Sequence, residues 1–378
     1  MNDKKSINIY AAILALALPL TASAATNFVQ HNLVSDIKGV ADNTDQYLVG
    51  SWGMSASPTS PFWVSNTTSG TSTLYNGIGL PNPLVVTIPS SPSGPQGAAG
   101  SPTGQVWNGY GAGNFEIVSG RPAGFIFATL DGTISGFNNA VTPNVLVMVD
   151  NYTSGAVYTG LGIGVSSAGP TLYAANFASG NIDTFDRNFN PVALPGGFVD
   201  TQLPAGFYPT NIQRFGRLMY VTYDQSTSTG RFVFGNGTGM VNVFDVDGNL
   251  VSRLLSPSAN LNVPWGLAIA GPNFGVFSYS LLVGNFGDGT ISAYDPLTGA
   301  YLGTMQDGKG NFLSIDGLWG IQFGSQGAGG NANGGDATAL FFASAPSGGA
   351  HGLFGSLRPA ADSIIPGEAS IVKARVRK

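Results

Sequence analysis

The chain has 378 residues, of which 43% are hydrophobic and 9% are charged, and it contains 55 Gly, 23 Pro and no Cys. This content of Gly and Pro excludes a helical bundle or coiled coil, whereas 23 Phe and 13 Tyr provide enough apolar surface to exclude bulk disorder. The lack of Cys excludes disulfides, thiolate catalysis and metal sites built on sulfur. The net charge of −5 argues against binding to nucleic acid.

The first 24 residues have the pattern of a secretory signal peptide. Lys4 and Lys5 form a basic start, residues 7–20 are mostly apolar, and small residues at 22–24 precede the expected cleavage site. We therefore expect export to the periplasm or the exterior. A retained membrane anchor is the disfavoured alternative, because the apolar run is shorter than the ~20 residues that span a bilayer and contains Pro19.

Internal repeats predict the architecture of the mature chain. Segments 176–186 (NFASGNIDTFD) and 285–295 (NFGDGTISAYD) match closely and begin 109 residues apart. Trp265 and Trp319, each followed by Gly, lie 54 residues apart, which is half of that separation. A repeat of about 54 residues fits both pairs, and weaker matches extend it to six units. The units begin near residues 51, 103, 161, 210, 263 and 317.

Each unit contains several short β-rich runs. The second runs cover residues 62–66, 125–129, 172–176, 219–223, 281–285 and 340–344. In five units a third run follows and ends in an aromatic residue with Asp or Asn after it. Fourth apolar runs cover 84–88, 145–149, 251–255 and 301–305, with a weaker one at 191–194. Four strands in each unit are typical of a propeller blade.

The sixth unit has no fourth strand of its own, because Arg358-Pro359 follows its third run at 352–357. Near the N-terminus, the alternating run 28–34 has no partner. Pairing this run with the last blade would close the ring and remove an exposed edge. The sequence therefore predicts an all-β fold: a six-bladed β-propeller of four-stranded blades over residues 25–359, closed by the N-terminal strand.

Three segments fall outside the predicted strands. Residues 89–103 and 325–336 are rich in Gly, Pro, Ser or Asn and are expected to form surface loops, either of which could cover a ligand. Residues 360–378 form a basic tail that we expect to be disordered, with binding to anionic lipid or polysaccharide as the alternative. No second hydrophobic span follows, so we expect no transmembrane segment in the mature chain.

Several motifs resemble a known family. They are NLVSD at 32–36, SPTSPFWVSN at 57–66, FATLDGTISG at 127–136, LVGNFGDG at 282–289, IDGLW at 315–319 and AHGLFG at 350–355. The chain resembles an uncharacterised family of secreted bacterial propeller proteins, distantly similar to NHL-repeat propellers and to the regucalcin and gluconolactonase group. The resemblance covers nearly the whole mature chain and implies the fold, but it carries over no activity and no catalytic residues.

The ends of the second strands provide one candidate site, a polar ring with one residue from each blade. Its members are Asn66, Thr129, Asn176, Tyr223, Asn285 and Ser344. The similarity to gluconolactonase-like propellers implies a divalent cation such as Ca²⁺ here, since hard cations take oxygen ligands. The ring contains no carboxylate, although Asp131 and Asp224 lie close to it in sequence. Asn before a Gly-containing turn also has a structural role, which we favour over the cation site.

Aromatic and imidazole side chains provide two further candidates. Trp52, Trp107, Trp265 and Trp319 lie near the starts of the inner strands, where they could hold a sugar ring at the channel mouth or pack between blades; we favour packing. The mature chain has two histidines, His31 and His351. His351 is the better candidate for catalysis, with Asp131 or Asp224 as weak acidic candidates, but a structural role for this loop histidine is favoured.

Two functions remain open at this point. The first is a non-catalytic, monomeric binding or scaffold protein of the bacterial envelope or exterior, with a polysaccharide or an envelope or extracellular protein as its partner and no required cofactor. The second is a lactonase-like hydrolase that depends on a divalent cation. The lack of an evident acid–base pair favours the first, whereas a metal ligated by carboxylate would favour the second.

Overall fold

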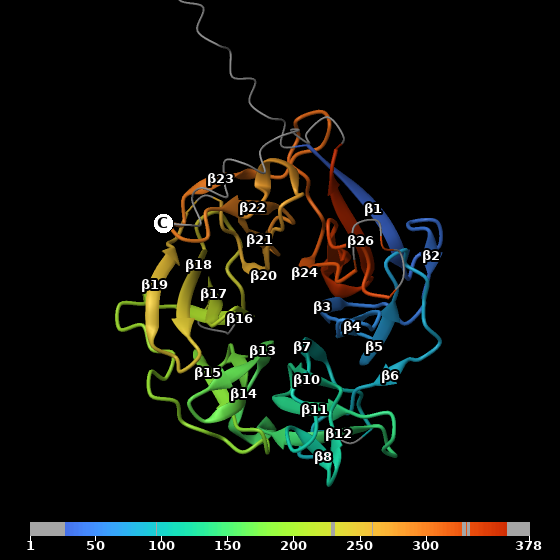
Figure 1. Cartoon of the computed structure of the whole chain (residues 1–378), viewed down its shortest axis with the longest axis vertical. Coiled ribbons are helices and arrows are strands. Elements are labelled where there is room, and N and C mark those ends of the chain that lie inside the picture. Colours follow the sequence, from blue (N-terminus) through green and yellow to red (C-terminus); the bar gives the residue numbers. More distant parts are fainter. Residues whose placement is uncertain are drawn as a thin grey trace, which may run out of the picture.

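Six β-sheets surround a central axis in the computed structural model, which describes residues 27–95, 97–227, 231–258, 260–326, 330 and 333–360 (Figure 1). The predicted six-bladed β-propeller is therefore confirmed. The predicted signal peptide and almost all of the basic tail lie outside the described residues. Within the described part of the chain, no helix combines the length and apolarity that a membrane crossing requires.

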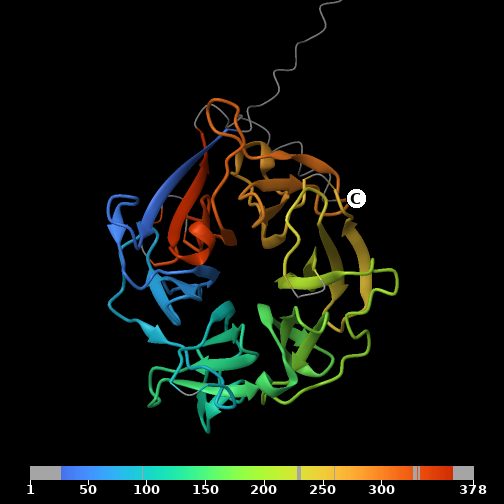
Figure 2. The ribbon, with the colours of Figure 1, turned by 180° about the vertical axis from the view of Figure 1, so that it is seen from behind.

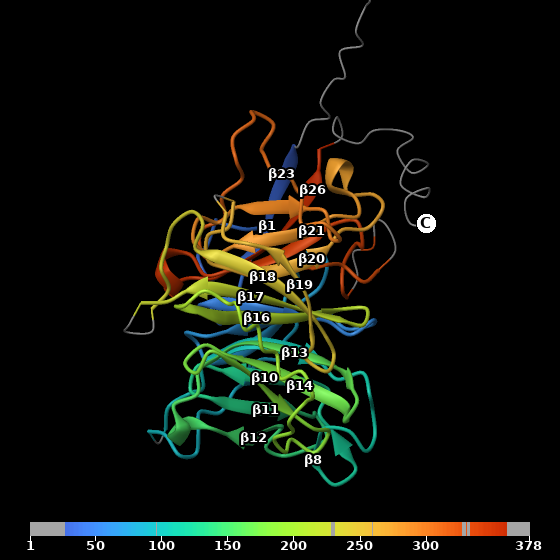
Figure 3. The same cartoon turned by 90° about the vertical axis from the view of Figure 1, so that its left-hand side faces the viewer.

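Each blade is an antiparallel sheet whose first strand lies nearest the axis, and the later strands follow outward (Figure 1). Figure 3 shows the ring of blades from the side. Blade 1 contains β3 (Ser51–Ser55), β4 (Phe62–Asn66), β5 (Thr71–Tyr75) and β6 (Val86–Thr87). Blade 2 contains β7 (Pro102–Trp107), β10 (Phe125–Thr129), β11 (Thr133–Phe137) and β12 (Val145–Asp150). Blade 3 contains β13 (Tyr158–Ser166), β14 (Gly169–Asn176) and β15 (Asn181–Phe185).

The last three blades follow the same plan. Blade 4 contains β16 (Phe207–Phe215), β17 (Leu218–Gln225), β18 (Gly239–Asp245) and β19 (Leu250–Leu255). Blade 5 contains β20 (Pro264–Ile269), β21 (Leu281–Asn285), β22 (Ile291–Tyr294) and β23 (Tyr301–Thr304). Blade 6 contains β24 (Leu318–Phe323), β25 (Leu340–Ser344) and β26 (Leu353–Pro359).

The N-terminal strand completes blade 6, as predicted. Strand β1 (Phe28–Ser35) pairs antiparallel with β26, from Phe28 opposite Pro359 to Ser35 opposite Leu353. Figure 2 shows the two strands side by side although they come from opposite ends of the chain. A short strand, β2 (Asn43–Thr44), then pairs parallel with β1 on the outer edge. The ring is thus closed by hydrogen bonds between the first and last strands.

Two details differ from the expected pattern. Blade 3 has three strands, and its predicted fourth run supplies only an isolated bridge between Phe185 and Pro191, because Pro191 and Pro195 have no N–H groups for a ladder. Blade 2 contains an unpredicted hairpin of β8 (Glu116–Val118) and β9 (Arg121–Pro122), inserted between its first two strands. Its buried Ile117 joins the core shared by blades 2 and 3.

The hydrophobic core consists of packing between neighbouring blades. Successive side chains of a strand point to opposite faces of the sheet, so one strand contributes to two interfaces. In β21, Leu281 and Val283 pack toward blade 4, whereas Leu282 packs toward blade 6. All five residues of β21 are buried, which explains why its sequence is a continuous apolar run rather than an alternating one.

Close approach of the inner strands at the axis depends on small residues at one equivalent position. A Cβ atom added at Gly53, Gly104 or Gly266 would lie 2.3–2.4 Å from a backbone atom of the next blade. A Cβ atom added at Gly320 of blade 6 would lie 2.8 Å from the carbonyl oxygen of Trp52 in blade 1. Blade 4 has Asn211 here instead, and its carboxamide donates a hydrogen bond to the carbonyl oxygen of Trp265 on blade 5.

We expect Gly266→Ala to lower the free energy of unfolding by about 1–3 kcal/mol, because its new methyl group must displace the backbone of blade 6. Gly271→Ala is the matched control, since no atom lies within 4 Å of a Cβ at that position. Chemical denaturation of both variants measures the difference. Equal effects of the two substitutions would show that close approach at the axis does not limit stability.

Candidate functional site

Three indoles fill the centre of the axial channel and form a tryptophan plug. Trp52 and Trp319 stack with ring centroids 3.6 Å apart, and Trp265 meets Trp319 edge to face at 6.0 Å. The indole nitrogen of Trp265 donates a hydrogen bond across the axis to the carbonyl oxygen of Thr159, at 3.0 Å. Trp52 and Trp319 line a cavity at one mouth of the channel, whereas Trp265 lines a second cavity at the other mouth.

The first cavity, here called the aromatic bowl, lies at the mouth where the inner strands begin. It has a volume of about 530 Å³, and all six blades contribute to its lining. Apolar contacts come from Leu130, Val157 and Ala345. Six aromatic side chains supply most of the remaining wall: Trp52, Phe177, Phe232, Phe234, Phe286 and Trp319.

The position after each polar-ring residue explains much of this lining. Side chains alternate along a strand, so the residue that follows a ring residue differs from it in direction. Five blades place this next residue in the bowl: Thr67, Leu130, Phe177, Phe286 and Ala345. In blade 4 the equivalent residue is Asp224, and the bowl is lined instead by Arg231, Phe232 and Phe234 from the connection between β17 and β18.

Phe232 connects the two sides of the bowl. Its ring centroid lies 4.8 Å from that of Phe177 and 6.0 Å from that of Trp319. Phe286 stacks on Trp319 at 3.9 Å, and Phe234 lies 5.8 Å from Phe286 with 60% of its surface exposed. Aromatic surface is therefore continuous from the buried plug to the solvent-exposed rim.

The polar-ring residues are buried and bond mainly within their own blades. The amide oxygen of Asn176 accepts hydrogen bonds from the N–H groups of Val157 and Ser179. Asn285 accepts one from the N–H of Asn262, and the hydroxyl groups of Thr129 and Thr133 are hydrogen-bonded to each other. Buried oxygens of Asn66 and Ser344 have no hydrogen-bond partner, and Tyr223 contributes a buried phenol.

These six side chains do not fit a cation site as they stand. They include no carboxylate, and the oxygens of three of them are already engaged in their hairpins. Across the described ranges, no group of three or more His, Asp or Glu residues is placed to hold a metal ion. The proposed cation ring gains no support from this geometry, and we derive no reaction step from it.

The histidines form two separate pairs with aspartates of blade 6 and its connections. His351 Nδ1 lies 2.7 Å from Asp36 Oδ2, and the other oxygen of Asp36 accepts a hydrogen bond from the N–H of Gly352. His31 Nε2 lies 2.8 Å from Asp42 Oδ2. No hydroxyl group is hydrogen-bonded to either imidazole in the parts of the chain that are described, so neither pair is extended to a nucleophile.

The two acidic candidates have different surroundings. Asp131 accepts a hydrogen bond from the N–H of Ser91 at 2.6 Å, which ties the connection before blade 2 to that blade. Asp224 is fully buried, and neither of its carboxylate oxygens has a hydrogen-bond partner. Burial raises the pKa of the Asp224 carboxyl to about 7. The nearby N–H of Gln225 and hydroxyl of Thr238 lower this pKa in part. Their hydrogen bonds, however, go to the carbonyl oxygens of Thr238 and Gly235 and leave the carboxylate without a donor.

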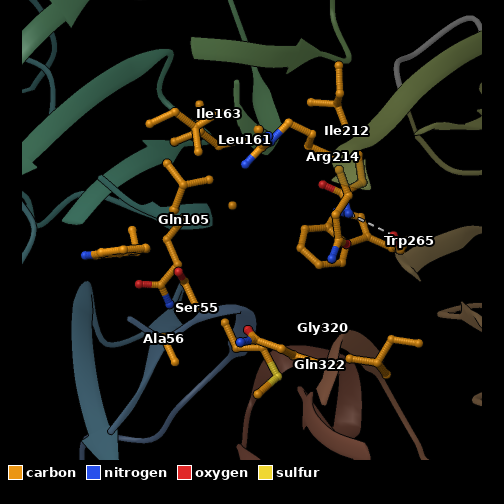
Figure 4. Close-up of a pocket in the computed structure, with 18 residues that line it drawn as sticks. Ser55, Ala56, Gln105, Leu161, Ile163, Ile212, Arg214, Trp265, Gly320 and Gln322 are labelled. Atoms are coloured by element: carbon orange, nitrogen blue, oxygen red, sulfur yellow. Dashed lines mark hydrogen bonds between the residues drawn. The ribbon is translucent and has the colours of Figure 1, made fainter. Parts of the chain in front are cut away.

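The structure separates Trp107 from the other three tryptophans. Trp52, Trp265 and Trp319 pack together between blades, whereas Trp107 lies at the opposite mouth and is 37% exposed. Trp107 and Trp265 line the second cavity, which we call the polar mouth and which has a volume of about 330 Å³ (Figure 4). The described residues of the two Gly-rich or Pro-rich loops line neither cavity.

Sequence reasoning missed the main aromatic residues of the bowl. Phe177 and Phe286 occupy the same place in the two best-matching repeats, directly after Asn176 and Asn285, so the repeat itself contained a signal. Phe232 and Phe234 had no such signal. They lie in the long connection between the second and third strands of blade 4, and only the fold brings them to the cavity.

Similarity to solved structures defines the class of protein. The streptogramin B lyase structure aligns with a TM-score of 0.51 and 13% identity, over 89% of this chain and 99% of that one. The PQQ-bound aldose sugar dehydrogenase from Streptomyces coelicolor aligns with a TM-score of 0.48 and 14% identity, over 89% and 99% of the two chains. At these identities the first comparison supports the β-propeller fold alone, and the second carries no argument.

Sequence relatives define the family. The chain is 32% identical to uncharacterized protein R648 of Acanthamoeba polyphaga mimivirus over 79% of this chain and 74% of the relative. It is also 32% identical to uncharacterized protein L690 of the same virus, over 76% and 77% of the two chains. The chain therefore belongs to the family of these mimivirus proteins. No family model matches it. Because these relatives are viral, they support neither a bacterial origin nor secretion.

We expect the buried carboxyl of Asp224 to make stability depend on pH. An unfolded Asp has a pKa of about 3.9, so between this value and about 7 the folded state binds more protons and loses stability as the pH rises. The loss is at most about 1.4 kcal/mol per pH unit. Asp224→Asn removes the charge, so the variant should be more stable than the wild type at pH 8 and similar to it at pH 4.

Urea denaturation of both proteins at several pH values between these limits provides the test. Asp186→Asn, at a partly exposed turn aspartate, serves as the control. Parallel stability curves for the wild type and Asp224→Asn would contradict the assignment of the pH dependence to this carboxyl group.

Proposed function

We propose that the protein is a non-catalytic binding propeller whose aromatic bowl holds a small aromatic molecule with a negative charge. One observation carries the proposal: six aromatic side chains line a cavity of about 530 Å³ at the mouth of the channel. This volume lies within the range of small-molecule sites. The aromatic rings offer faces and edges for stacking on a planar ligand.

The charge of the ligand is inferred from Arg231. It is the charged residue of the bowl lining, and no ion pair in the described ranges includes it. A guanidinium beside an apolar cavity pairs well with a carboxylate or sulfonate, because the surrounding rings reduce the competition from water.

The composition of the lining supports binding rather than catalysis. None of the residues that form the described wall of the bowl is an Asp, Glu, His, Lys or Tyr, so the wall offers no group for acid–base work near neutral pH. The two His–Asp pairs and Asp224 lie outside this lining. Export of the protein remains a proposal supported by the N-terminal sequence pattern.

We expect the aromatic anion 8-anilinonaphthalene-1-sulfonate to bind in the bowl and to quench the fluorescence of Trp52 and Trp319. Phe234→Ala should weaken its affinity about tenfold, because an exposed ring that faces the ligand is lost. Arg231→Gln should also lower the affinity for this probe about tenfold, but should leave the affinity for the neutral analogue N-phenyl-1-naphthylamine nearly unchanged. Fluorescence titration measures all of these affinities.

Phe312→Ala is the matched control, because Phe312 is 61% exposed and does not line the bowl. Melting curves confirm that each variant is folded before titration. If Phe234→Ala and Phe312→Ala bind the probe alike, or if Arg231→Gln weakens both probes equally, the proposed site or its charge preference is wrong.

A further inference from the structure

The polar mouth is a second cavity, independent of the aromatic bowl. The inner strands run from the bowl toward this mouth, and residues from the inner strands of all six blades line it. Figure 4 shows side chains that approach the cavity from several blades, with Gln105 and Trp265 on opposite sides. The tryptophan plug lies between this cavity and the bowl, and no residue lines both.

Carboxamide groups with unused hydrogen-bonding capacity gather in this cavity. Asn211 is buried, with 3% of its surface exposed, and its amide nitrogen donates a hydrogen bond to the carbonyl oxygen of Trp265 at 2.9 Å. The amide oxygen of Asn211 accepts no hydrogen bond from the described residues. The amides of Gln213 and Gln322, from blades 4 and 6, likewise have no partner there. This differs from the polar ring, where three Asn or Thr side chains are satisfied within their hairpins.

Two indoles and one cation complete the polar mouth. Trp265 presents a ring that its bond to Thr159 holds in place, and Trp107 is 37% exposed at the rim. Arg214 is exposed, donates to the carbonyl oxygen of Gly216 at 3.2 Å and forms no ion pair within the described ranges. The cavity therefore combines amide donors and acceptors, aromatic faces and an unpaired positive charge.

We propose that the polar mouth binds the end of an acidic saccharide. Sugar hydroxyl groups donate and accept hydrogen bonds at once, as the amides of Asn211, Gln213 and Gln322 require. The apolar face of a sugar ring packs on an indole, and a sugar carboxylate pairs with the guanidinium of Arg214. A volume of about 330 Å³ is at the lower end for small-molecule sites, which suits a terminal sugar unit.

The test uses α-1,4-linked digalacturonate and its neutral counterpart galactobiose, with calorimetric titration of the folded wild-type protein. We expect the wild type to bind digalacturonate more tightly than galactobiose. Arg214→Ala should lower the affinity for digalacturonate about tenfold and change the affinity for galactobiose little, since one charge-assisted contact is lost. The double variant Gln213→Ala/Gln322→Ala should lower the affinity for both saccharides by about tenfold or more.

Arg217→Ala is the matched control, because Arg217 lies on the same β16–β17 hairpin, is exposed and does not line the cavity. Phe234→Ala serves as a second control, since it alters only the bowl, and should leave saccharide binding unchanged. Absence of binding by the wild type would overturn the proposal. It would also be overturned by a preference for galactobiose, by binding that survives the double variant, or by equal losses in Arg214→Ala and Arg217→Ala.

Discussion

The closeness of the six inner strands at the axis is the constraint on which the rest of the structure depends. Five blades meet it with Gly at an equivalent position, where an added Cβ atom would collide with the next blade, and blade 4 meets it with Asn211. The blade 3 member is Gly160, whose added Cβ would lie 2.6 Å from the Cα atom of Asn211. The narrow channel that results can be filled by three indoles. Their stacking joins blades 1, 5 and 6, and the Trp265 bond to Thr159 adds blade 3. Ring closure and the central plug thus stabilise each other.

This plug also explains why the protein has two axial cavities of different character. The first residues of most inner strands and the hairpins beside them surround one mouth, while residues further along the inner strands surround the other. The hairpins place aromatic rings in the bowl. The inner strands β16 and β24 place Asn211, Gln213, Arg214 and Gln322 in the polar mouth. One ring of strands therefore supports two binding proposals that can be tested separately.

Membership in a family of uncharacterised mimivirus proteins shows common descent but supplies no activity, and the propeller fold is compatible with many functions. Functional inference must therefore depend on the cavities themselves. The bowl combines six aromatic side chains with Arg231, and the polar mouth combines the amides of Asn211, Gln213 and Gln322 with Arg214. Both proposals are therefore for recognition of a ligand, and each is argued from the side chains that line one cavity.

The sequence by itself determined the number of blades, their second strands and the closure by residues 28–34. These features follow from local patterns, since a repeat of apolar runs and turns is visible whatever surrounds it. It also suggested that Trp52, Trp265 and Trp319 pack between blades, but it could not separate Trp107 from them. Only the tertiary structure decided which side chains face a cavity. Phe232 and Phe234 meet Phe177 and Phe286 because the fold brings residues of an irregular connection to the channel mouth, and contacts between residues so distant in sequence have no local signature.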